Sequence, residues 1–470
     1  MIKKHQNKER KLSMVYLDDL VPEDHLLRQI DAVMDFDFIY DYVEDLYSKT
    51  GRPSIDPVVL IKYALLQRLE NRNSMRGTFR EAEVNIAHRW FLGYELDEKL
   101  PHFSDYSKNY KERFSKKIDI KDDEGNIIGQ KTVFAILFSE VLLRVAEHGF
   151  LDVRHIYADS THIKANANKR KVDKVEIDEE CKAYQEELDK EIDAYCKERG
   201  LKQPKPIKLK KKTKKVSQTD PECGIFNKGE HEVQAAYLAQ TISDDNGFVL
   251  ETQVNPANLH DSTTFKEPYT IVLKQYGVGE GKICSIALDA GYKTPAVLRE
   301  IIESGVTPLL PYTSPKGKKN NEEKATKVVK KDFEYNEQKD VFYCPQGYEM
   351  TPRGVDRKTG YITYRCETKN CKNCPMREKC LSKSQTSKTV IRHIWDSYLK
   401  EAEKIRHSEF HARHYPRRKE TIERVFADAK EKHCARYTRL RGLDKVQDEM
   451  YLIFACMNLK KLARWAWKKA

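Results

Sequence analysis

The sequence has no long apolar run and no apolar leader near its start. Its most apolar candidate for a membrane span, Val133 to Phe138, is far shorter than the ~18 residues that a spanning helix needs and is soon followed by Glu140 and Arg144. No apolar segment follows Met1-Ile2-Lys3-Lys4-His5-Gln6, as it would in a secretory signal. We therefore expect a cytoplasmic protein with no membrane partner, whose 11 cysteines are reduced thiols or metal ligands.

The charge balance favours a polyanionic partner. Across 470 residues, 85 Lys and Arg stand against 73 Asp and Glu, a formal excess of 12 positive charges. The basic residues occur in clusters, which is typical of proteins that bind nucleic acid. Many soluble proteins are basic, so the charge suggests this partner without selecting it. A chain of this length also has enough material for two or three domains.

Residues 1–150 are predicted to form an N-terminal helical domain. Asp56-Pro57 is a helix start, an N-cap followed by proline at the first helical position, and apolar residues at helical spacing follow it. Further helices are expected over 74–91, 104–114 and 131–148. Their basic outer faces suit DNA, although on charge alone a solvated helical surface explains them equally well.

Residues 151–312 alternate between strand and helix patterns. Strands are expected over 156–158, 233–242, 248–254, 283–288 and 306–310, and a helix over 294–303. The turn Asp244-Asp245-Asn246-Gly247 ends in Asn-Gly, the strongest short signal for a hairpin. Strand, hairpin, strand, helix and strand in this order predict a mixed α/β sheet.

A charged insert, residues 165–220, interrupts this pattern. Residues 171–199 are predicted to form one or two exposed helices. The Lys-rich stretch 202–215 follows, without a core-forming pattern. A solvated, disordered linker is the default interpretation of such a stretch, and an arm that contacts phosphates is the alternative.

Two apolar runs each end in an aspartate. Ile156-Tyr157-Ala158 leads into Asp159, and Ile286-Ala287-Leu288 leads into Asp289. A carboxylate at a strand end is held by the sheet but open at its tip, as a metal ligand must be. One such Asp is more often a helix cap or turn residue. Two of them, followed by a Glu on a basic helix, form a stronger pattern.

The Glu belongs to residues 386–470, which are expected to be helical almost throughout. Glu423 lies at the edge of the apolar stripe of its helix, and Lys430 falls two turns later on a similar face. Glu420, one turn earlier, is the competing choice, and an ordinary surface helix with ion pairs is the alternative interpretation. Three carboxylates on different elements suit phosphodiester chemistry with two divalent cations ~3.5–4 Å apart, which take oxygen ligands.

Cysteine concentrates in residues 313–385, predicted to be a Lys-rich linker followed by a cysteine-rich insertion. The candidate zinc ligands are Cys371 and Cys374, spaced as Cys-x-x-Cys, with Cys344 and Cys380 as partners and Cys366 as the alternative. Four thiolates satisfy a closed structural zinc site. Reduced thiols without a metal are the other interpretation.

The order of these features resembles the DDE transposases of bacterial insertion sequences. Asp159, the hairpin, Asp289 and then Ile422-Glu423-Arg424-Val425-Phe426 through Lys430 carry the resemblance. The branch that it resembles has a cysteine-rich insertion before the helix of the catalytic Glu. Further matching stretches are Gly51-Arg52-Pro53, Leu60-Ile61-Lys62, Thr219-Asp220-Pro221-Glu222-Cys223-Gly224, Cys371-Lys372-Asn373-Cys374-Pro375, Arg439-Leu440-Arg441-Gly442 and Asn458-Leu459-Lys460. Each motif alone is modest, but their order is specific and spans nearly the whole chain.

The resemblance implies a fold and an activity. The fold would be a ribonuclease H-like mixed sheet core with an N-terminal DNA-binding domain, and two Mg²⁺ or Mn²⁺ ions would be held by Asp159, Asp289 and Glu423. The enzyme would bind the terminal inverted repeats of its element, hydrolyse DNA there and join the freed 3′-hydroxyl to target DNA. It would associate with the nucleoid when bound to DNA, as a homodimer, because two ends must meet.

Related transposases also carry a Tyr, an Arg and a Lys around the Glu. Lys430 matches the Lys position, whereas Tyr415 and Arg418 fit only with a shift of one residue, and Lys419 stands at the Arg position. The residues expected to contact DNA are Arg418, Lys419, Lys430, Arg439 and Arg441.

Two other functions stay open on the sequence. One is a non-catalytic DNA-binding protein descended from a transposase, although all three carboxylates are present. The other is a nuclease that hydrolyses DNA without strand transfer.

Overall fold

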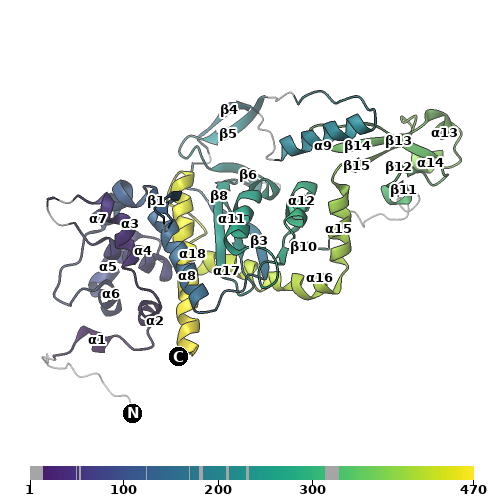
Figure 1. Ribbon diagram of the computed structural model, residues 1–470. Coiled ribbons are helices and arrows are strands. Elements are labelled where there is room, and N and C mark those ends of the chain that lie inside the picture. Colours follow the sequence, from purple (N-terminus) through teal and green to yellow (C-terminus); the bar gives the residue numbers. More distant parts are fainter. Residues whose placement is uncertain are drawn as a thin grey trace, which may run out of the picture.

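The computed structural model describes residues 14–48, 50–51, 54–122, 124–168, 170–178, 184–207, 211–228, 232–312 and 328–469. Figure 1 shows a helical N-terminal part, a central six-stranded sheet and a separate five-stranded sheet at the far end. The mixed α/β class predicted from the sequence is confirmed. Within the described ranges, no helix is both long enough and apolar enough to cross a membrane.

The N-terminal part is a packed set of mostly short helices. They are α1 (Leu17–Leu20), α2 (Leu26–Val33), α3 (Phe38–Val43), α4 (Pro57–Leu69), α5 (Met75–Val84), α6 (Ile86–Leu92), α7 (Phe103–Asn109) and α8 (Val133–Glu147). The α4 helix begins as predicted, because the Asp56 side chain accepts a hydrogen bond from the Val58 N–H. The helix expected over 74–91 is instead two helices, since Asn85 takes an extended conformation and its side chain caps α6.

This part of the chain is not helical throughout. The strands β1 (Ile118–Lys121) and β2 (Ile127–Lys131) form an antiparallel pair between α7 and α8. Their sequence alternates weakly and β2 is exposed along its whole length. The pairing therefore comes from the turn between the strands, where Asp122 accepts hydrogen bonds from the backbone N–H groups of Glu124 and Asn126, and not from a buried face.

The central sheet is built around β3 (His155–Lys164). The other strands are β6 (Gly224–Lys228), β7 (Glu232–Ser243), β8 (Val249–Pro256), β9 (Ser285–Ala287) and β10 (Thr307–Leu309). β3 pairs antiparallel with β7, which pairs antiparallel with β6 and β8. On its other edge β3 pairs parallel with β9, and β9 pairs parallel with β10. The predicted hairpin and the apolar strands before both aspartates are confirmed. The prediction that Asp159 lies at a strand end is wrong, because β3 stays paired with β7 as far as Lys164.

Helices cover this sheet and join it to the rest of the chain. They are α10 (Asp261–Thr264), α11 (Lys266–Tyr276), α12 (Pro295–Glu303), α15 (Asp396–Arg406), α16 (Glu409–His414), α17 (Ile422–Lys432) and α18 (Leu443–Lys469). The helix predicted over 294–303 is confirmed as α12, which Thr294 caps from its side chain. The β3 residues Ile156, Tyr157 and Ala158 are at most 1% exposed, as expected of a central strand with covered faces.

The long α18 helix stands between the N-terminal helices and the sheet (Figure 1). It packs against α2, α4 and α8 on one side and against β8 and α17 on the other. Glu449 of α18 forms a buried ion pair with Arg68 of α4. The Asn458 side chain accepts a hydrogen bond from the Val249 N–H and donates one to the Val249 carbonyl. A helix hydrophobic on most of its circumference is typical of such a buried position.

A second apolar core joins two stretches that are far apart in the sequence. The antiparallel sheet of this core contains β11 (Glu334–Asn336), β12 (Val341–Tyr343), β13 (Glu349–Val355), β14 (Tyr361–Cys366) and β15 (Thr389–His393), with the short helices α13 (Thr368–Lys372) and α14 (Arg377–Cys380). The helix α9 (Gln185–Glu198) of the charged insert packs on it, with Leu188, Ile192 and Cys196 fully buried.

The charged insert therefore differs from its prediction. Residues 171–199 are not exposed helices, because the first part is the strand β4 (Val172–Asp178) and α9 is buried on one face. The Lys-rich stretch is not simply a linker, since β5 (Lys211–Ser217) pairs antiparallel with β4. Asp178 faces Lys211, which also pairs with Glu176 at 4.0 Å, whereas Lys174 faces Lys215. Of the Lys-rich stretch 315–332, residues 315–327 lie outside the described ranges.

Asp448 of α18 provides a test of how the N-terminal helices pack against α18. Its side chain is 4% exposed and accepts a hydrogen bond from the Thr132 hydroxyl, and burial raises its pKa to about 7. An acid whose folded pKa exceeds its unfolded pKa stabilises the fold at low pH and loses that contribution as the pH rises toward the folded pKa.

We expect wild-type protein to lose about 2–3 kcal/mol of stability relative to Asp448→Asn between about pH 5 and about pH 8. Asn keeps the acceptor for Thr132 but does not titrate. Urea unfolding of both proteins at the two pH values measures the difference. An unchanged difference would contradict the burial of this carboxyl group.

Candidate active site

Asp159 and Asp289 lie at the same level on neighbouring strands. The parallel register of β3 and β9 joins His155 to Ser285 and Tyr157 to Ala287, so its continuation by two residues brings Asp289 beside Asp159. Asp289 ends the strand and accepts a hydrogen bond from the Ala290 N–H at 2.7 Å, which begins the 3-10 turn η3 (Ala290–Tyr292). The sheet thus fixes both backbones while the Asp289 side chain stays exposed.

Glu423 joins the site through an arginine. Arg418 lies in the 3-10 segment η5 (Tyr415–Lys419), directly before α17, and is 7% exposed. Its guanidinium donates one hydrogen bond to Asp159 Oδ2 at 2.5 Å and another to Glu423 Oε1 at 2.9 Å. One buried cation therefore links the central strand to the first turn of α17, and charge-assisted contacts of this kind are stronger than neutral ones.

The charges at this site shift the pKa values of Asp159 and Tyr415. Burial raises the pKa of Asp159 to about 6, Arg418 opposes this shift, and the charges of Asp289 and Asp261 add to it. Burial also raises the pKa of Tyr415 to about 12, and Asp289, Glu423 and Asp159 contribute to that rise. Tyr415 therefore lies within electrostatic range of all three predicted carboxylates.

Asp261 is a fourth carboxylate at this place, and no signal in the sequence marked it as a site residue. It begins α10, accepts a hydrogen bond from the Ser160 hydroxyl at 2.7 Å and raises the pKa of Asp159. A Cβ on Gly291 would lie 3.2 Å from Asp261 Oδ2, so a small residue is needed there. An Asp at a helix start is so common as a cap that only the fold reveals its nearness to Asp159.

Glu420 lies away from this arrangement. It is exposed and directly precedes α17, and it lines a separate groove with Thr421 and Arg424. Glu423, by contrast, shares Arg418 with Asp159. The geometry therefore favours Glu423 over Glu420 as the third carboxylate of the site.

The other residues expected to contact DNA are spread over two places. Lys419 is exposed beside Arg418, and Lys430 is half-buried near the end of α17. Arg439 and Arg441 are exposed in the segment before α18, where the Arg441 Nε donates to the Asn166 carbonyl and the Asn166 side chain donates to the Arg439 carbonyl. These contacts hold the segment against the chain that follows β3.

The predicted zinc ligands gather but do not form a metal site. The five cysteines Cys344, Cys366, Cys371, Cys374 and Cys380 line one small cavity. Burial and the neighbouring thiols raise the pKa of Cys366 to about 12. Among the residues that the structure describes, no group of three or more His, Cys, Asp or Glu side chains is placed to hold a metal ion.

Comparisons with known proteins identify the family. The family model "Transposase DDE domain" matches residues 343–463, a range that contains the cysteines and Glu423, and the model "Transposase domain (DUF772)" matches residues 15–112. The two matches indicate a DDE-type transposase of the insertion-sequence type, so they bear out the resemblance seen in the sequence.

Other comparisons add little to this assignment. No curated protein matches the sequence. Among solved structures, the piggyBac transposase synaptic complex with hairpin DNA, determined by cryo-EM, overlays on 93% of this chain and 78% of its own, with 8% sequence identity and a TM-score of 0.32. A likeness this weak transfers neither fold nor activity.

Replacing Arg418 tests whether it holds the site together. Arg418→Met leaves Asp159 without its counter-ion. We therefore expect the free energy of unfolding near neutral pH to fall by about 1–3 kcal/mol. The loss should lie in the lower part of this range because Glu423 is half-exposed. Urea unfolding in EDTA measures this.

The neighbouring Arg417→Met is the matched control. Arg417 pairs with Asp245 but its side chain is 46% exposed, and Asp245 keeps the Tyr157 hydroxyl as a donor. Its loss should therefore cost less than about 1 kcal/mol. Equal losses in the two variants would contradict a special role of Arg418.

Proposed function

We propose that the chain binds the terminal inverted repeats of its insertion sequence, cleaves DNA at the element ends and joins those ends to target DNA. The observation that carries this is that Arg418 donates to both Asp159 and Glu423, while the register of β3 and β9 brings Asp289 beside Asp159. Crowded carboxylates that share a cation are suited to exchange it for other positive charge.

We also propose that the central sheet is a ribonuclease H-like core, formed by residues 151–312 and 386–470. The support is its order: an antiparallel hairpin pairs with one edge of β3, and two parallel strands follow on the other. Residues 1–150 would be the DNA-binding domain, and residues 313–385 an insertion that packs with α9 of the insert 165–220.

The chemistry of the donor set fits Mg²⁺ or Mn²⁺. In the described part of the chain Arg418 donates to both Asp159 and Glu423, so these side chains are arranged around the guanidinium and not around an ion. Carboxylate oxygens are the ligands that these hard cations prefer, and Asp159, Asp289 and Glu423 would hold them. The chemistry that such ions supply when bound is activation of the attacking oxygen and neutralisation of charge on the leaving oxygen. Asp261, hydrogen-bonded to Ser160, would help to fix the Asp159 backbone.

Arg418 would have a second position in this enzyme. Its guanidinium now neutralises Asp159 and Glu423, while its Nε atom is buried without a hydrogen-bond partner among the described residues. Once the carboxylates hold cations, the guanidinium is free to donate to a DNA phosphate, for which its planar set of donors is suited. Lys419, Lys430, Arg439 and Arg441 would contact phosphates nearby, and two copies of the chain would bring two ends together.

Carboxamide variants test the catalytic assignment. We expect Asp289→Asn and Glu423→Gln to reduce Mg²⁺-dependent cleavage of DNA carrying the element ends by at least about 100-fold, with end-binding intact. Glu420→Gln is the matched control, since it changes the same residue type one turn away and should cleave normally. Normal cleavage by Asp289→Asn would overturn the assignment.

Strand transfer separates a transposase from a nuclease. Cut ends incubated with a target plasmid and Mg²⁺ should yield joined products that appear on a gel as linear or nicked plasmid carrying the labelled end. Cleavage without joined products would favour the nuclease, and binding without any cleavage would favour a DNA-binding descendant of a transposase.

Structural zinc is a separate prediction made from the sequence, and metal analysis tests it. If Cys344, Cys371, Cys374 and Cys380 close around an ion, freshly purified protein should contain about one zinc per chain, and Cys371→Ser with Cys374→Ser should remove it. Protein purified without chelator and free of zinc would establish these residues as reduced core thiols.

A further inference from the structure

A broad groove leads away from the acidic site between α17 and α18. Its volume is about 840 Å³. The basic side chains that line it are Arg424, Lys432, Lys460, Lys461, Arg464 and Lys468, and the acidic ones are Asp24, Glu420 and Asp428. None of these basic residues is among those that the sequence marked for DNA contact. Glu423 does not line the groove, but its chain neighbour Arg424 does, so the groove lies along an adjacent face of α17.

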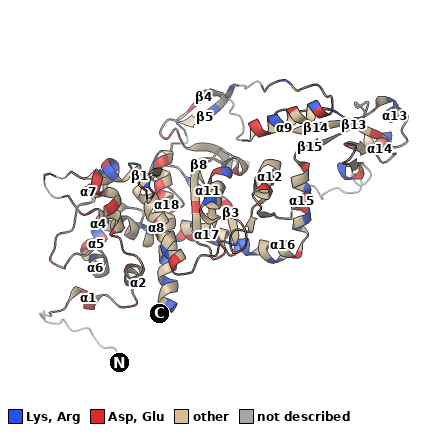
Figure 2. Cartoon of the chain, viewed as in Figure 1, with Lys and Arg blue, Asp and Glu red and all other residues tan. Residues whose placement is uncertain are grey.

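Most of the basic side chains lie along one face of α17 and one face of α18, and both faces line the groove. On α17, Arg424, Asp428 and Lys432 follow each other at intervals of four residues, and on α18 Lys460, Arg464 and Lys468 do the same. Residues four apart lie on one face of a helix. Figure 2 shows the basic end of α18 near the chain terminus.

The cations in the groove exceed the anions that could pair with them. Asp428 pairs with Lys432 at 2.7 Å. Burial, followed by the charges of Arg464 and Lys432, lowers the pKa of Lys460. Repulsion of this kind is relieved when phosphates enter a basic cleft, whereas it brings no benefit to a surface that only meets water.

The β7–β8 turn lines the groove and is hydrogen-bonded to α18. The β7–β8 turn contributes Asn246 and Gly247, and Lys461 donates a hydrogen bond to the Asn246 carbonyl. A Cβ on Gly247 would lie 3.2 Å from the Lys461 Nζ, and Gly247 has a φ of +74°, so glycine suits this place in both respects.

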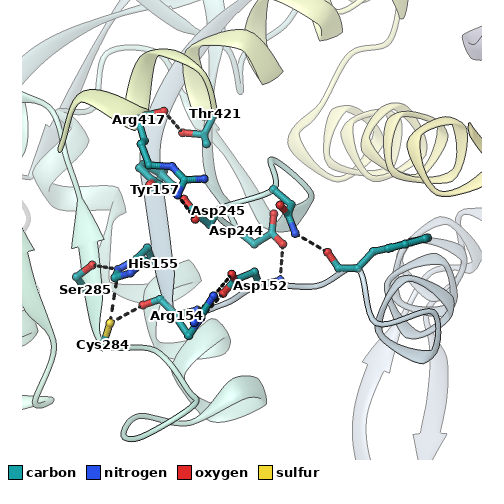
Figure 3. Close-up of polar contacts among 12 residues, drawn as sticks. Asp152, Arg154, His155, Tyr157, Asp244, Asp245, Cys284, Ser285, Arg417 and Thr421 are labelled. Atoms are coloured by element: carbon teal, nitrogen blue, oxygen red, sulfur yellow. Dashed lines mark hydrogen bonds and ion pairs between the residues drawn. The ribbon is translucent and has the colours of Figure 1, made fainter. Parts of the chain in front are cut away.

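Two buried acids of that turn, Asp244 and Asp245, bind it to neighbouring segments, as Figure 3 shows. Asp244 accepts hydrogen bonds from the N–H groups of Asp152 and Phe248 at 2.9 and 2.7 Å. Asp245 accepts one from the Tyr157 hydroxyl and pairs with Arg417, which precedes Arg418. The turn that forms the groove is thereby tied to the segment that enters the acidic site.

Residues from both of the regions that the transposase family models match line this groove. Asp24, Leu26 and Gln29 line it from the N-terminal part, which the transposase domain model matches, and the rest comes mainly from the region matched by the DDE model. An exposed aromatic side chain, Trp467, lies at the C-terminal end and is 45% exposed.

We propose that this groove binds the sugar–phosphate backbone of duplex DNA and leads it to the acidic site. The proposal rests on the proposed function and adds the surface along which the substrate lies. Arg424, Arg464 and Lys468 would contact phosphates, and such contacts position DNA without reading its sequence. The groove would therefore bind element ends and unrelated DNA alike.

A triple variant tests the groove. Arg424→Ala/Arg464→Ala/Lys468→Ala removes three exposed cations and should leave the fold intact. The control, Lys190→Ala/Lys197→Ala/Lys404→Ala, removes three exposed cations from α9 and α15 and changes the net charge equally. Fluorescence anisotropy in EDTA would follow binding to a labelled duplex with the element end and to a scrambled duplex of equal length, over a series of salt concentrations.

We expect the groove variant to bind both duplexes at least about tenfold more weakly. In a plot of log affinity against log salt concentration, the slope for the groove variant should be shallower than the wild-type slope by about 2–3. Each lost phosphate contact reduces the slope by about 0.9. The control should retain the wild-type affinity and slope. Wild-type affinity and slope in the groove variant would overturn the proposal, and so would a loss confined to the element-end duplex, which would indicate sequence reading.

The outcome is separable from that of the proposed function. If wild-type protein cleaves element ends in Mg²⁺ while the groove variant binds normally, only the groove proposal fails. If the groove variant loses binding while Asp289→Asn cleaves like the wild type, only the catalytic assignment fails.

Discussion

The contact of Arg418 with Asp159 and Glu423 is the interaction on which the candidate site depends. Asp159 comes from the centre of the sheet and Glu423 from a helix more than 260 residues later, and one buried guanidinium donates to both. Without a cation between them, burial and neighbouring acids would favour protonation of Asp159, whose pKa is already raised to about 6. The positive charge of Arg418 therefore stabilises the ionised forms of Asp159 and Glu423 at this short separation.

The fold supplies the rigid frame that this contact needs. The parallel register of β3 and β9 fixes the level of Asp289 relative to Asp159. The α18 helix joins the N-terminal helices, the sheet and α17, so the element that carries Glu423 is packed on both sides. The ion pair of Arg68 with Glu449 and the hydrogen bond of Thr132 with Asp448 fix the N-terminal helices to α18.

The sequence predicted those parts whose signals are local. The strands before Asp159 and Asp289 are apolar runs, and the hairpin between them has an Asn-Gly turn, so short-range chemistry was sufficient. The strand β4 and the buried face of α9 were missed because their residues are highly charged, and only pairing with β5 or packing on a distant sheet explains them. The expected site residues Asp159, Asp289, Glu423 and Arg418 converge, but Asp261 and the basic groove depend on tertiary contacts that no spacing in the sequence reveals.

Titration with Mn²⁺ tests the central claim most directly, because it asks whether these carboxylates bind divalent cations at all. Calorimetry or electron paramagnetic resonance would compare the wild type, Asp289→Asn and Arg418→Met without any DNA. The account predicts that the wild type binds Mn²⁺, that Asp289→Asn binds it at least about tenfold more weakly, and that Arg418→Met binds it more tightly because the competing guanidinium is gone. Absence of Mn²⁺ binding to the wild type, or equal affinity in all three proteins, would contradict it.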